Sequence, residues 1–473
     1  MKRVVIRLLV ASIAFIGACT PVKKVREVRR EMPASYAVQQ QDSLNSASIP
    51  WTDFFDDPHL KGLITEALSN NQELNVLWQR ISIAKNEIKA RKGEYLPFVG
   101  YRAGAELEKS SRYTRNGAVE EQLELEGKPF PDPLGNLGLG LEASWELDIW
   151  KKLRSAKKAA VMEYLATVEG RNFMMTQLVA EIAENYFELV ALDTKLEIIN
   201  QNLRIQGAAL EVVRLQKKAA RATNLAVKRF EAEVLKNKSE KYDLKQRIVE
   251  VENALNFLIG RKQQVISRNT DDFLRRKLLP VHAGLPASLL SNRPDVRKAE
   301  YELAAAKLNV KVARARFYPS LGLKAGVGLQ AFNSQFLTQT PGALVYRLGA
   351  DLVGPLINRN AIKAAYSSAS SEQLARVFDY EKTLLKAFLE VENQLAKVEN
   401  LAQSYQLQSK QVLALTQSIG IANKLYQSAR ADYMEVLLTQ RDALESKMAL
   451  VETKKEQFVA RVSVYKALGG GWK

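Results

Sequence analysis

Residues 137–147 read LGLGLEASWEL, a stretch in which every second residue is apolar and small or acidic residues stand between. Residues 321–329, LGLKAGVGL, alternate in the same way. Because successive side chains of a strand point to opposite faces, this period of two predicts strands with one apolar and one polar face. In a soluble sandwich the apolar face meets another sheet. In an outer-membrane barrel it meets lipid, and about ten residues are enough to cross.

Long stretches without proline lie beside these alternating segments. All 14 prolines fall outside residues 134–279 and 356–473. Since a proline within a helix costs roughly 3 kcal/mol, these stretches, which are rich in Ala, Leu, Glu and Lys, suit long helices. Val377, Leu384 and Val391 share one helical face, as a coiled-coil stripe requires. If residues 155–218 are largely one helix, it extends on the order of 95 Å.

The chain repeats its own pattern. Residues 97–104 recur at 319–326, an offset of 222, with one Pro, two Gly and one basic residue in the same places. In the helical parts the offset is 209, and it relates Gly260 to Gly469. Each half of the chain therefore reads as helix, strand, strand, long helix and helix.

Two strands in each half make four strands for the whole chain. Four strands cannot close a barrel, and an open edge cannot lie in lipid, because unpaired backbone groups there cost several kcal/mol each. The barrel must be shared, with eight strands from two copies or twelve from three; the larger number leaves a lumen. The predicted fold class is mainly α, a long helical coiled coil joined to a membrane β-barrel that several chains build together.

The first nineteen residues indicate export and anchoring. Three basic residues precede a short apolar run over residues 8–16, which predicts a secretory signal in residues 1–18. The run ends in Ile-Gly-Ala-Cys at residues 16–19, which resembles the box before a lipidated cysteine. Cys19 is the only cysteine, so no internal disulfide is possible. We expect acylation of Cys19, a free thiol at a chance position being the alternative.

These signals predict the organisation of the chain. After the signal, residues 19–60 form a lipid-anchored N-terminal segment, and residues 261–290 form a linker between the two repeats. The first repeat covers residues 61–260, with strands at about 98–107 and 137–147. The second repeat covers residues 291–473, with strands at about 320–329 and 345–353 and a GGGW tail.

Four stretches carry a resemblance to a known family. They are LLSNRPDVRKAE at 289–300, ARARFYPSLGL at 313–323, YMEVLLTQ at 433–440 and YKALGGGW at 465–472. In this order and spacing they resemble the TolC-like outer-membrane efflux proteins. The ending resembles the lipoprotein subgroup of that family, which works with RND-type pumps. The resemblance runs from about residue 50 to the end of the chain.

The resemblance implies a homotrimer in the outer membrane, held also by lipid at Cys19, with a twelve-stranded barrel and a helical tunnel in the periplasm. It also implies an equatorial region around the tunnel, built from residues 19–60, the linker 261–290 and the end of the chain. Such a channel docks with a periplasmic adaptor protein and an inner-membrane RND-type pump. The pump supplies the energy and selects the exported molecule. Drugs, metal ions and siderophores therefore all remain open as cargo, and the chain itself is expected to be a passive conduit.

The resemblance also implies a periplasmic gate at the helix turn of the second repeat. Glu435 stands at the usual acidic position of the family, with Asp432 near it, and Tyr426 matches an aromatic residue that latches the closed state in some relatives. Leu438 stands where many relatives carry a second acid, so one acidic ring and two are both open. Carboxylate rings at a narrow aperture select cations. The alternative is that Glu435 and Asp432 are ordinary solvated helix residues.

A basic cluster marks the predicted turn of the first helix pair. It consists of Lys217, Lys218, Arg221, Lys228 and Arg229, of which the first three are the candidate contact for a partner. These residues are either a solvated turn or a contact for acidic residues on the adaptor.

Several classes of function lack support in the sequence. The formal charge of +17 is spread along the chain with Glu between the basic residues, and no nucleic-acid-binding motif accompanies it. No metal-ligand spacing, phosphate loop or catalytic pair is present, so we expect neither an enzyme nor a metal or cofactor site. The competing class is a structural coiled-coil outer-membrane lipoprotein without transport, which does not need four alternating strands.

Overall fold

The structure is a computed structural model that describes residues 26, 28–37, 44–125, 127–428 and 430–473. The predicted signal and Cys19 lie outside the described residues. The chain forms two compact units, one holding Ser82–Leu165 with Tyr301–Phe378 and the other Val28–Ile81, Ala166–Glu300 and Asp379–Lys473. Each unit therefore takes residues from both repeats, and the domain boundaries expected from the sequence stay predictions.

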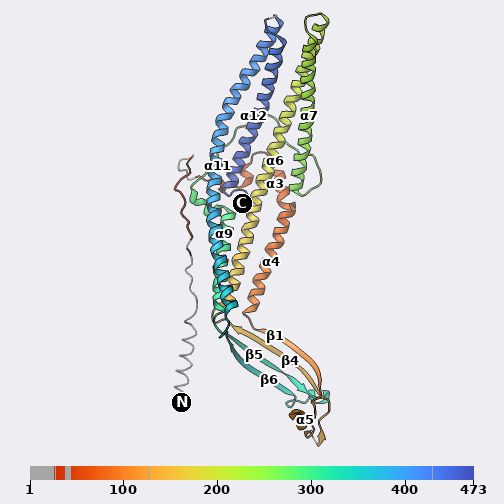
Figure 1. Cartoon of the computed structure of the whole chain (residues 1–473), viewed down its shortest axis with the longest axis vertical. Coiled ribbons are helices and arrows are strands. Elements are labelled where there is room, and N and C mark those ends of the chain that lie inside the picture. The colour runs from red at the N-terminus through yellow and green to blue at the C-terminus, as the bar shows by residue number, and fades with distance from the viewer. Residues whose placement is uncertain (1–25, 27, 38–43, 126, 429) are drawn as a thin grey trace. The chain divides into compact units, whose positions relative to one another are not determined.

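Four long strands form one antiparallel sheet in the first unit (Figure 1). In their order across the sheet they are β1 (Phe98–Glu108), β4 (Leu134–Leu147), β5 (Ser320–Ala331) and β6 (Leu344–Val353). The strands β4 and β5 come from different repeats and pair in the middle, so β1 and β6 are the edges. Short elements occupy the two hairpin loops, namely α5 (Arg115–Glu120), β2 (Glu124–Leu125), β3 (Lys128–Pro129) and α10 (Ser334–Leu337).

Specific side chains join the sheet to the helices of the same unit. The Asp148 carboxylate, directly after β4, accepts hydrogen bonds from the backbone N–H groups of Leu153 and Arg154, both at 2.9 Å. It thereby satisfies free donors at the start of the next helix. The Trp150 indole donates to the Pro319 carbonyl at 2.8 Å and stacks on Tyr318, with ring centroids 4.6 Å apart. These contacts consequently fix the junction between the strands and the helix that follows β4.

Long helices make up most of the chain and confirm the predicted fold class. They are α4 (Gln72–Glu94), α6 (Lys152–Lys218), α7 (Asn224–Ile259), α9 (Pro294–Ala315), α11 (Asn360–Gln427) and α12 (Tyr433–Ala467). Shorter helices are η2 (Ser46–Ser48), α2 (Trp51–Phe54), α3 (Pro58–Asn70), η3 (Phe273–Arg275), η4 (Pro286–Ser288) and α8 (Leu289–Asn292). Both halves follow the predicted order of helix, strand, strand, long helix and helix. Among the helices of the described residues, none is long and apolar enough to cross a membrane.

The largest hydrophobic core lies in the second unit. It packs α3, the middle of α6, the end of α7 and α12 around buried aromatic rings. Phe54 stacks on Tyr465 at 3.9 Å and Phe187 stacks on Phe458 at 4.6 Å. The N-terminal segment, the first repeat and the end of the chain thus share one core.

Two glycines at equivalent positions of the two repeats have the same backbone conformation and the same close contact. Gly260 follows α7 with φ of 80°, and Gly469 follows α12 with φ of 90°. A Cβ atom at Gly260 would lie 2.6 Å from the Asn70 carbonyl oxygen, and one at Gly469 would lie 2.5 Å from that of Asn292. Both positions need glycine, for the left-handed backbone and for the close approach. The two asparagines are related by the offset of 222 and the two glycines by 209.

The neighbouring residues repeat a hydrogen bond. Asn71 donates from Nδ2 to the Leu258 carbonyl at 2.8 Å, and Arg293 donates from Nη1 to the Ala467 carbonyl at 2.8 Å. Both pairs obey the same two offsets. The two halves of the chain therefore close their helix pairs with the same joint, although the donor is an amide in one and a guanidinium in the other.

Arginines of the linker between the repeats hold it to the helices of the second unit. Arg268 forms ion pairs with Asp193 of α6 and Glu252 of α7. Arg276 pairs with Asp57 at 3.3 Å, and the Tyr186 hydroxyl donates to the same carboxylate at 2.9 Å. Because these groups are largely shielded from water, their pairing is worth more than that of surface ions.

Candidate functional site

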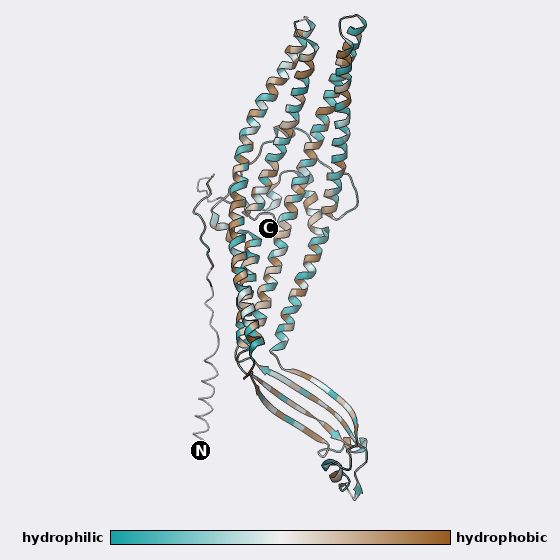
Figure 2. Ribbon diagram, in the orientation of Figure 1, coloured by the Kyte–Doolittle hydropathy of each residue, from teal (hydrophilic) through white to brown (hydrophobic). Residues whose placement is uncertain are grey.

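The register of the sheet separates an apolar face from a polar one. Directly opposed residues of an antiparallel sheet share a face, and the row Tyr101, Leu141, Val327 and Tyr346 runs across all four strands. The next row runs from Arg102 through Gly140 and Gly328 to Val345 and lies on the other face. The alternation is visible along each strand in Figure 2. A sheet of this kind can stand between a hydrocarbon phase and water.

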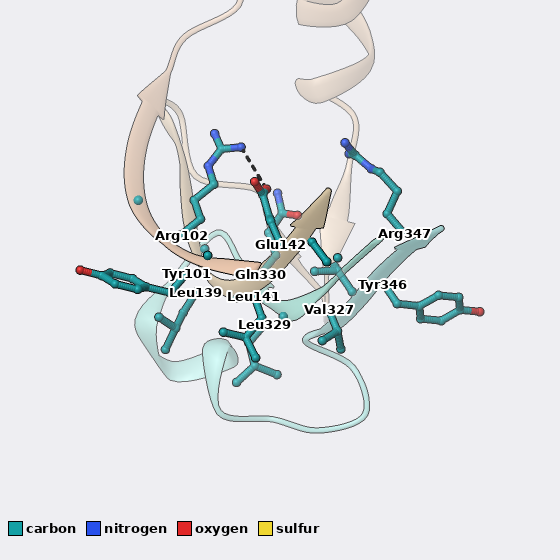
Figure 3. Close-up of a pocket in the computed structure, with 18 of the residues that line it drawn as sticks. Tyr101, Arg102, Leu139, Leu141, Glu142, Val327, Leu329, Gln330, Tyr346 and Arg347 are labelled. Carbon is teal, nitrogen blue, oxygen red and sulfur yellow. Dashed lines mark ion pairs between the residues drawn. The ribbon is translucent and has the colours of Figure 1, made fainter. Parts of the chain in front are cut away.

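The polar face bounds a hollow of about 930 Å³. Figure 3 shows Arg102, Glu142 and Arg347 on the side of the sheet opposite to Tyr101 and Tyr346. Arg102 pairs with Glu142 at 3.6 Å across β1 and β4. On the same face of the sheet Lys324 pairs with Asp351 at 2.9 Å, and Gln330 donates to Asn136 at 2.7 Å. The lining of the hollow therefore includes charged and amide groups, beside apolar residues such as Leu139 and Leu329.

Glycines line the middle of the polar face. Gly140 and Gly328 stand directly opposite each other on β4 and β5. A Cβ atom at Gly140 would lie 2.7 Å from the Val327 carbonyl oxygen, and one at Gly328 would lie 2.5 Å from that of Leu139. Side chains at these positions would collide with the backbone of the neighbouring strand. The absence of side chains lets the sheet bend towards its polar face.

The turn between α6 and α7 carries the basic cluster. Lys217 donates from Nζ to the Asn224 side-chain carbonyl at 2.8 Å, while Lys218 and Arg221 are exposed. Thr223 begins α7 by accepting a hydrogen bond from the Ala226 backbone N–H at 3.2 Å. The turn is thus well defined, and the side chains of Lys218 and Arg221 are exposed on it.

The turn between α11 and α12 carries the acidic pair. Asp432 is the N-cap residue of α12 but its side chain makes no capping hydrogen bond, and Glu435 lies in the first turn of the helix. Both side chains are exposed. Carboxylates at a helix N-terminus are favoured by the helix dipole, so their position alone is ordinary helix chemistry. Glu435 and Asp432 thus lie at the same helix end, and their role at a gate stays a prediction.

Three contacts hold the second turn against the first helix pair. The Tyr426 hydroxyl, near the end of α11, donates a short hydrogen bond to the side-chain carbonyl of Gln216 in α6. Burial raises the pKa of Tyr426 above its usual value. Arg229 of α7 donates to the Met434 sulfur at 2.7 Å, and Leu437 joins a buried cluster with Phe230. The Tyr426 side chain therefore joins α11 to α6 near the two turns.

Sequence reasoning did not predict the contacts of Tyr426 and of the turn that follows it. Met434 and Leu437 lie in the YMEVLLTQ segment and Arg229 lies in the basic cluster, but no pattern in the sequence pairs them or joins Tyr426 to Gln216, because the partners come from positions about two hundred residues apart. Arg293 is a different case, because its segment was noticed for its resemblance to a family motif. Its side chain is only 5% exposed, forms ion pairs with Asp295 at 2.7 Å and Glu390 at 2.9 Å, and closes the joint described above.

Within the described residues there is no group of three or more His, Cys, Asp or Glu side chains that would hold a metal ion. The functional groups at the two turns and on the polar face of the sheet are charged groups, side-chain amides and the Tyr426 hydroxyl.

Comparisons with known proteins point in one direction. The model of the outer membrane efflux protein family matches residues 63–261 and 285–470. The pyoverdine export outer membrane protein OpmQ of Pseudomonas aeruginosa is 27% identical over 468 residues, which cover 98% of this chain and 96% of that protein. The cation efflux system protein CusC of Escherichia coli is 27% identical over 467 residues, covering 97% and 96%. The crystal structure of the open MtrE outer membrane channel of Neisseria gonorrhoeae matches with a TM-score of 0.84 at 24% identity, covering 96% of this chain and 99% of that one.

Proposed function

Because the chain belongs to the outer membrane efflux protein family, we propose that it serves as the outer-membrane channel of a tripartite efflux system. It lies in the outer membrane and is a passive conduit for small molecules. The observation that carries this proposal is the four-stranded sheet with one apolar and one polar face. The helices that follow its hairpins have 67 and 68 residues, long enough to line a path of about 100 Å.

The channel is a homotrimer. One chain leaves the backbone edges of β1 and β6 unpaired, and such edges must be paired before the sheet can lie in lipid. Three copies supply twelve strands and a lumen. The helices support assembly as well, since Leu235, Tyr242 and Val249 stand at heptad spacing on α7 and are 59%, 68% and 41% exposed. An exposed apolar heptad stripe is a surface for a neighbouring helix.

A single preparation tests the channel and its oligomeric state. The detergent-purified protein should have the mass of three chains in native mass spectrometry and should open stable conductances in planar bilayers. A trimer that never conducts is the result expected of a structural coiled-coil lipoprotein, and it would overturn the proposal. A stable monomer in lipid would overturn the shared barrel.

The partners are a periplasmic adaptor and an inner-membrane RND-type pump. We assign the contact with the adaptor to the exposed basic turn, Lys218 and Arg221 with Lys217, because three copies of this turn give a positively charged rim. Arg221→Glu should weaken co-purification of the adaptor, and the loss should be larger at low salt. Lys238→Glu, an equal change of charge at an exposed position farther along α7, is the matched control. Equal binding by both variants would remove the rim from the contact.

The gate is assigned to the turn of the second repeat. The Tyr426 hydroxyl holds this turn to α6, and Glu435 with Asp432 supplies exposed carboxylates next to it. In three copies these carboxylates form a ring of like charge at the narrow end of the tunnel, which attracts cations and repels anions. Opening begins with the separation of α11 and α12 from the first helix pair.

Lipid at Cys19 adds a second anchor to the one formed by the strands. The support is the sequence box at residues 16–19, directly after the apolar run. Acyl chains at the mature N-terminus hold a chain to the membrane independently of its strands.

The cargo of the system is selected by the pump. OpmQ is named for pyoverdine and CusC for cations, yet both are 27% identical to this chain over nearly its full length. A conduit of one design thus serves chemically different molecules. Replacement of the pump with the channel unchanged should change the exported molecules, and an unchanged range would contradict this division of labour.

A further inference from the structure

The polar face of the sheet leaves three charges without partners. Its ion pairs join Arg102 with Glu142, Lys324 with Asp351, and Glu146 with Lys152 just after β4. Within the described part of the chain, the remaining charged residues of this face form no ion pair. They are Glu106 and Glu108 on β1 and Arg347 on β6. The acidic residues thus stand on one edge strand and the basic residue on the other.

We propose that Arg347 of one protomer forms an ion pair with Glu106 of the next protomer, across the seam where β6 meets β1. This inference rests on the shared barrel of the proposed function. The occupant of each free edge is a second copy of this chain, because the leftover charges are complementary and each edge also offers unpaired backbone groups. The strand directions agree, since the sheet is antiparallel throughout and β6 and β1 run in opposite directions.

The faces of the two strands limit the possible registers. A shift of one residue would place Arg347 on the apolar face, so only shifts of two residues preserve the alternation. Pairing of Leu344 with Leu107 lets every residue of β6 face one of β1 and sets Arg347 opposite Gly104. Glu106 is then the diagonal neighbour of Arg347, within reach of a long side chain.

The next allowed register leads to the same pair. A slide of two residues places Arg347 directly opposite Glu106 and still pairs most of both strands. In the first register the other diagonal neighbour is Arg102, but its charge is already met by Glu142 within its own chain. A slide of two residues in the opposite direction would set Arg347 opposite Arg102, where like charges repel. The two registers that avoid this repulsion both bring Arg347 to Glu106. The ion pair thus opposes slippage by one residue and closes the ring of charges around the lumen.

Thiol cross-linking tests the contact directly. The double variant Arg347→Cys with Glu106→Cys should give covalent dimers and trimers on a denaturing gel with a linker that spans about 8 Å, the diagonal distance in a sheet. Each single variant controls for Cys19. The matched control is Arg347→Cys with Glu142→Cys, in which the second position lies two strands away within the same chain. It should give no product larger than a monomer.

Charge reversal supplies an independent measurement. Arg347→Glu and Glu106→Arg should each lower the temperature at which the unboiled trimer dissociates, and the two together should recover most of that loss. A wild-type trimer whose double cysteine variant never cross-links and whose reversals do not rescue each other would overturn the seam contact and leave the channel intact. A wild-type protein that forms no trimer would instead overturn the proposed function on which the seam depends.

Discussion

Replacement of Tyr426 by phenylalanine should open the gate more often without changing its selectivity. The substitution removes one hydroxyl, and with it the hydrogen bond to Gln216 that joins α11 to α6. A hydrogen bond of this kind contributes about 1 kcal/mol net, which changes the ratio of open to closed states about five-fold for one chain. If the gate opens only when all three latches are broken, the sum is about 3 kcal/mol and the ratio rises about 150-fold.

Single-channel recording in planar bilayers measures this ratio directly. Burial raises the pKa of Tyr426 above its usual value, so the hydroxyl stays protonated and donates throughout the neutral range. The effect of Tyr426→Phe should therefore not change between about pH 6 and pH 9. Gln216→Leu should raise opening to a similar extent, and the double variant should add little beyond either single one, because both remove the same bond.

A matched control separates a latch from a general loosening of the helices. The Tyr405 hydroxyl donates to the Leu274 carbonyl at 2.7 Å, and its ring is also partly buried. Tyr405→Phe removes a comparable hydrogen bond away from the turn and should leave the open fraction unchanged. An equal rise in both variants, or no rise with Tyr426→Phe, would refute the latch.

The other predictions concern the charge at the gate, the bend of the sheet and the lipid. Glu435→Gln should lower the preference for cations in bilayers at low salt, and the difference should fade near 1 M salt, where charges are screened within about 3 Å. Gly328→Ala should weaken the trimer by about 1–3 kcal/mol because its Cβ meets the neighbouring backbone, while Gly349→Ala, with open space around it, should not; dissociation temperatures on unboiled gels compare the two. Mass spectrometry of the mature protein should find an acylated Cys19 at its N-terminus, and an unmodified terminus elsewhere would contradict the anchor.

The strands and long helices were predictable because each has a local signature. The alternation at residues 137–147 requires only neighbouring side chains, and so does the lack of proline through α6 and α11. The repeat was predictable for a related reason, since Gly260 and Gly469 both occupy a left-handed backbone position that favours glycine. Features of this kind can be recognised in the sequence because each depends on the type of residue at a position and not on a distant partner.

The contacts of the candidate gate had no such signature. Gln216 and Tyr426 lie on different helices, each in a segment where polar and apolar residues alternate as in any coiled coil. Nothing near Gln216 distinguishes it from other glutamines of α6. The family resemblance supplied Tyr426 but no partner for it, and only the packing of α12 on α7 through Leu437 brings the two turns together.

The segment around Arg293 resembles a family motif, but the sequence alone did not predict the structural role of its arginine. Its counterpart in the first half is Asn71, which makes the same bond to a helix-end carbonyl with a neutral side chain. The guanidinium does more, because it also binds Asp295 and Glu390, whereas Glu181, the repeat partner of Glu390, has no arginine partner within the described residues. Burial, and then the nearby Glu184 and Glu73, raise the pKa of Glu181.

The two joints therefore have the same backbone geometry but different charges. An arginine deep in the second joint ties α9, α11 and the end of α12 into one block, since removal of one partner would leave a buried charge unpaired. The first joint has only an amide hydrogen bond at the same place. The gate proposed for the second helix pair requires motion at its far turn while its near end stays in place, and the charged joint is suited to hold that end. On this proposal, the repeated fold builds the wall of the channel, and the departure from exact repetition allows one helix pair to move at its turn while its base stays closed.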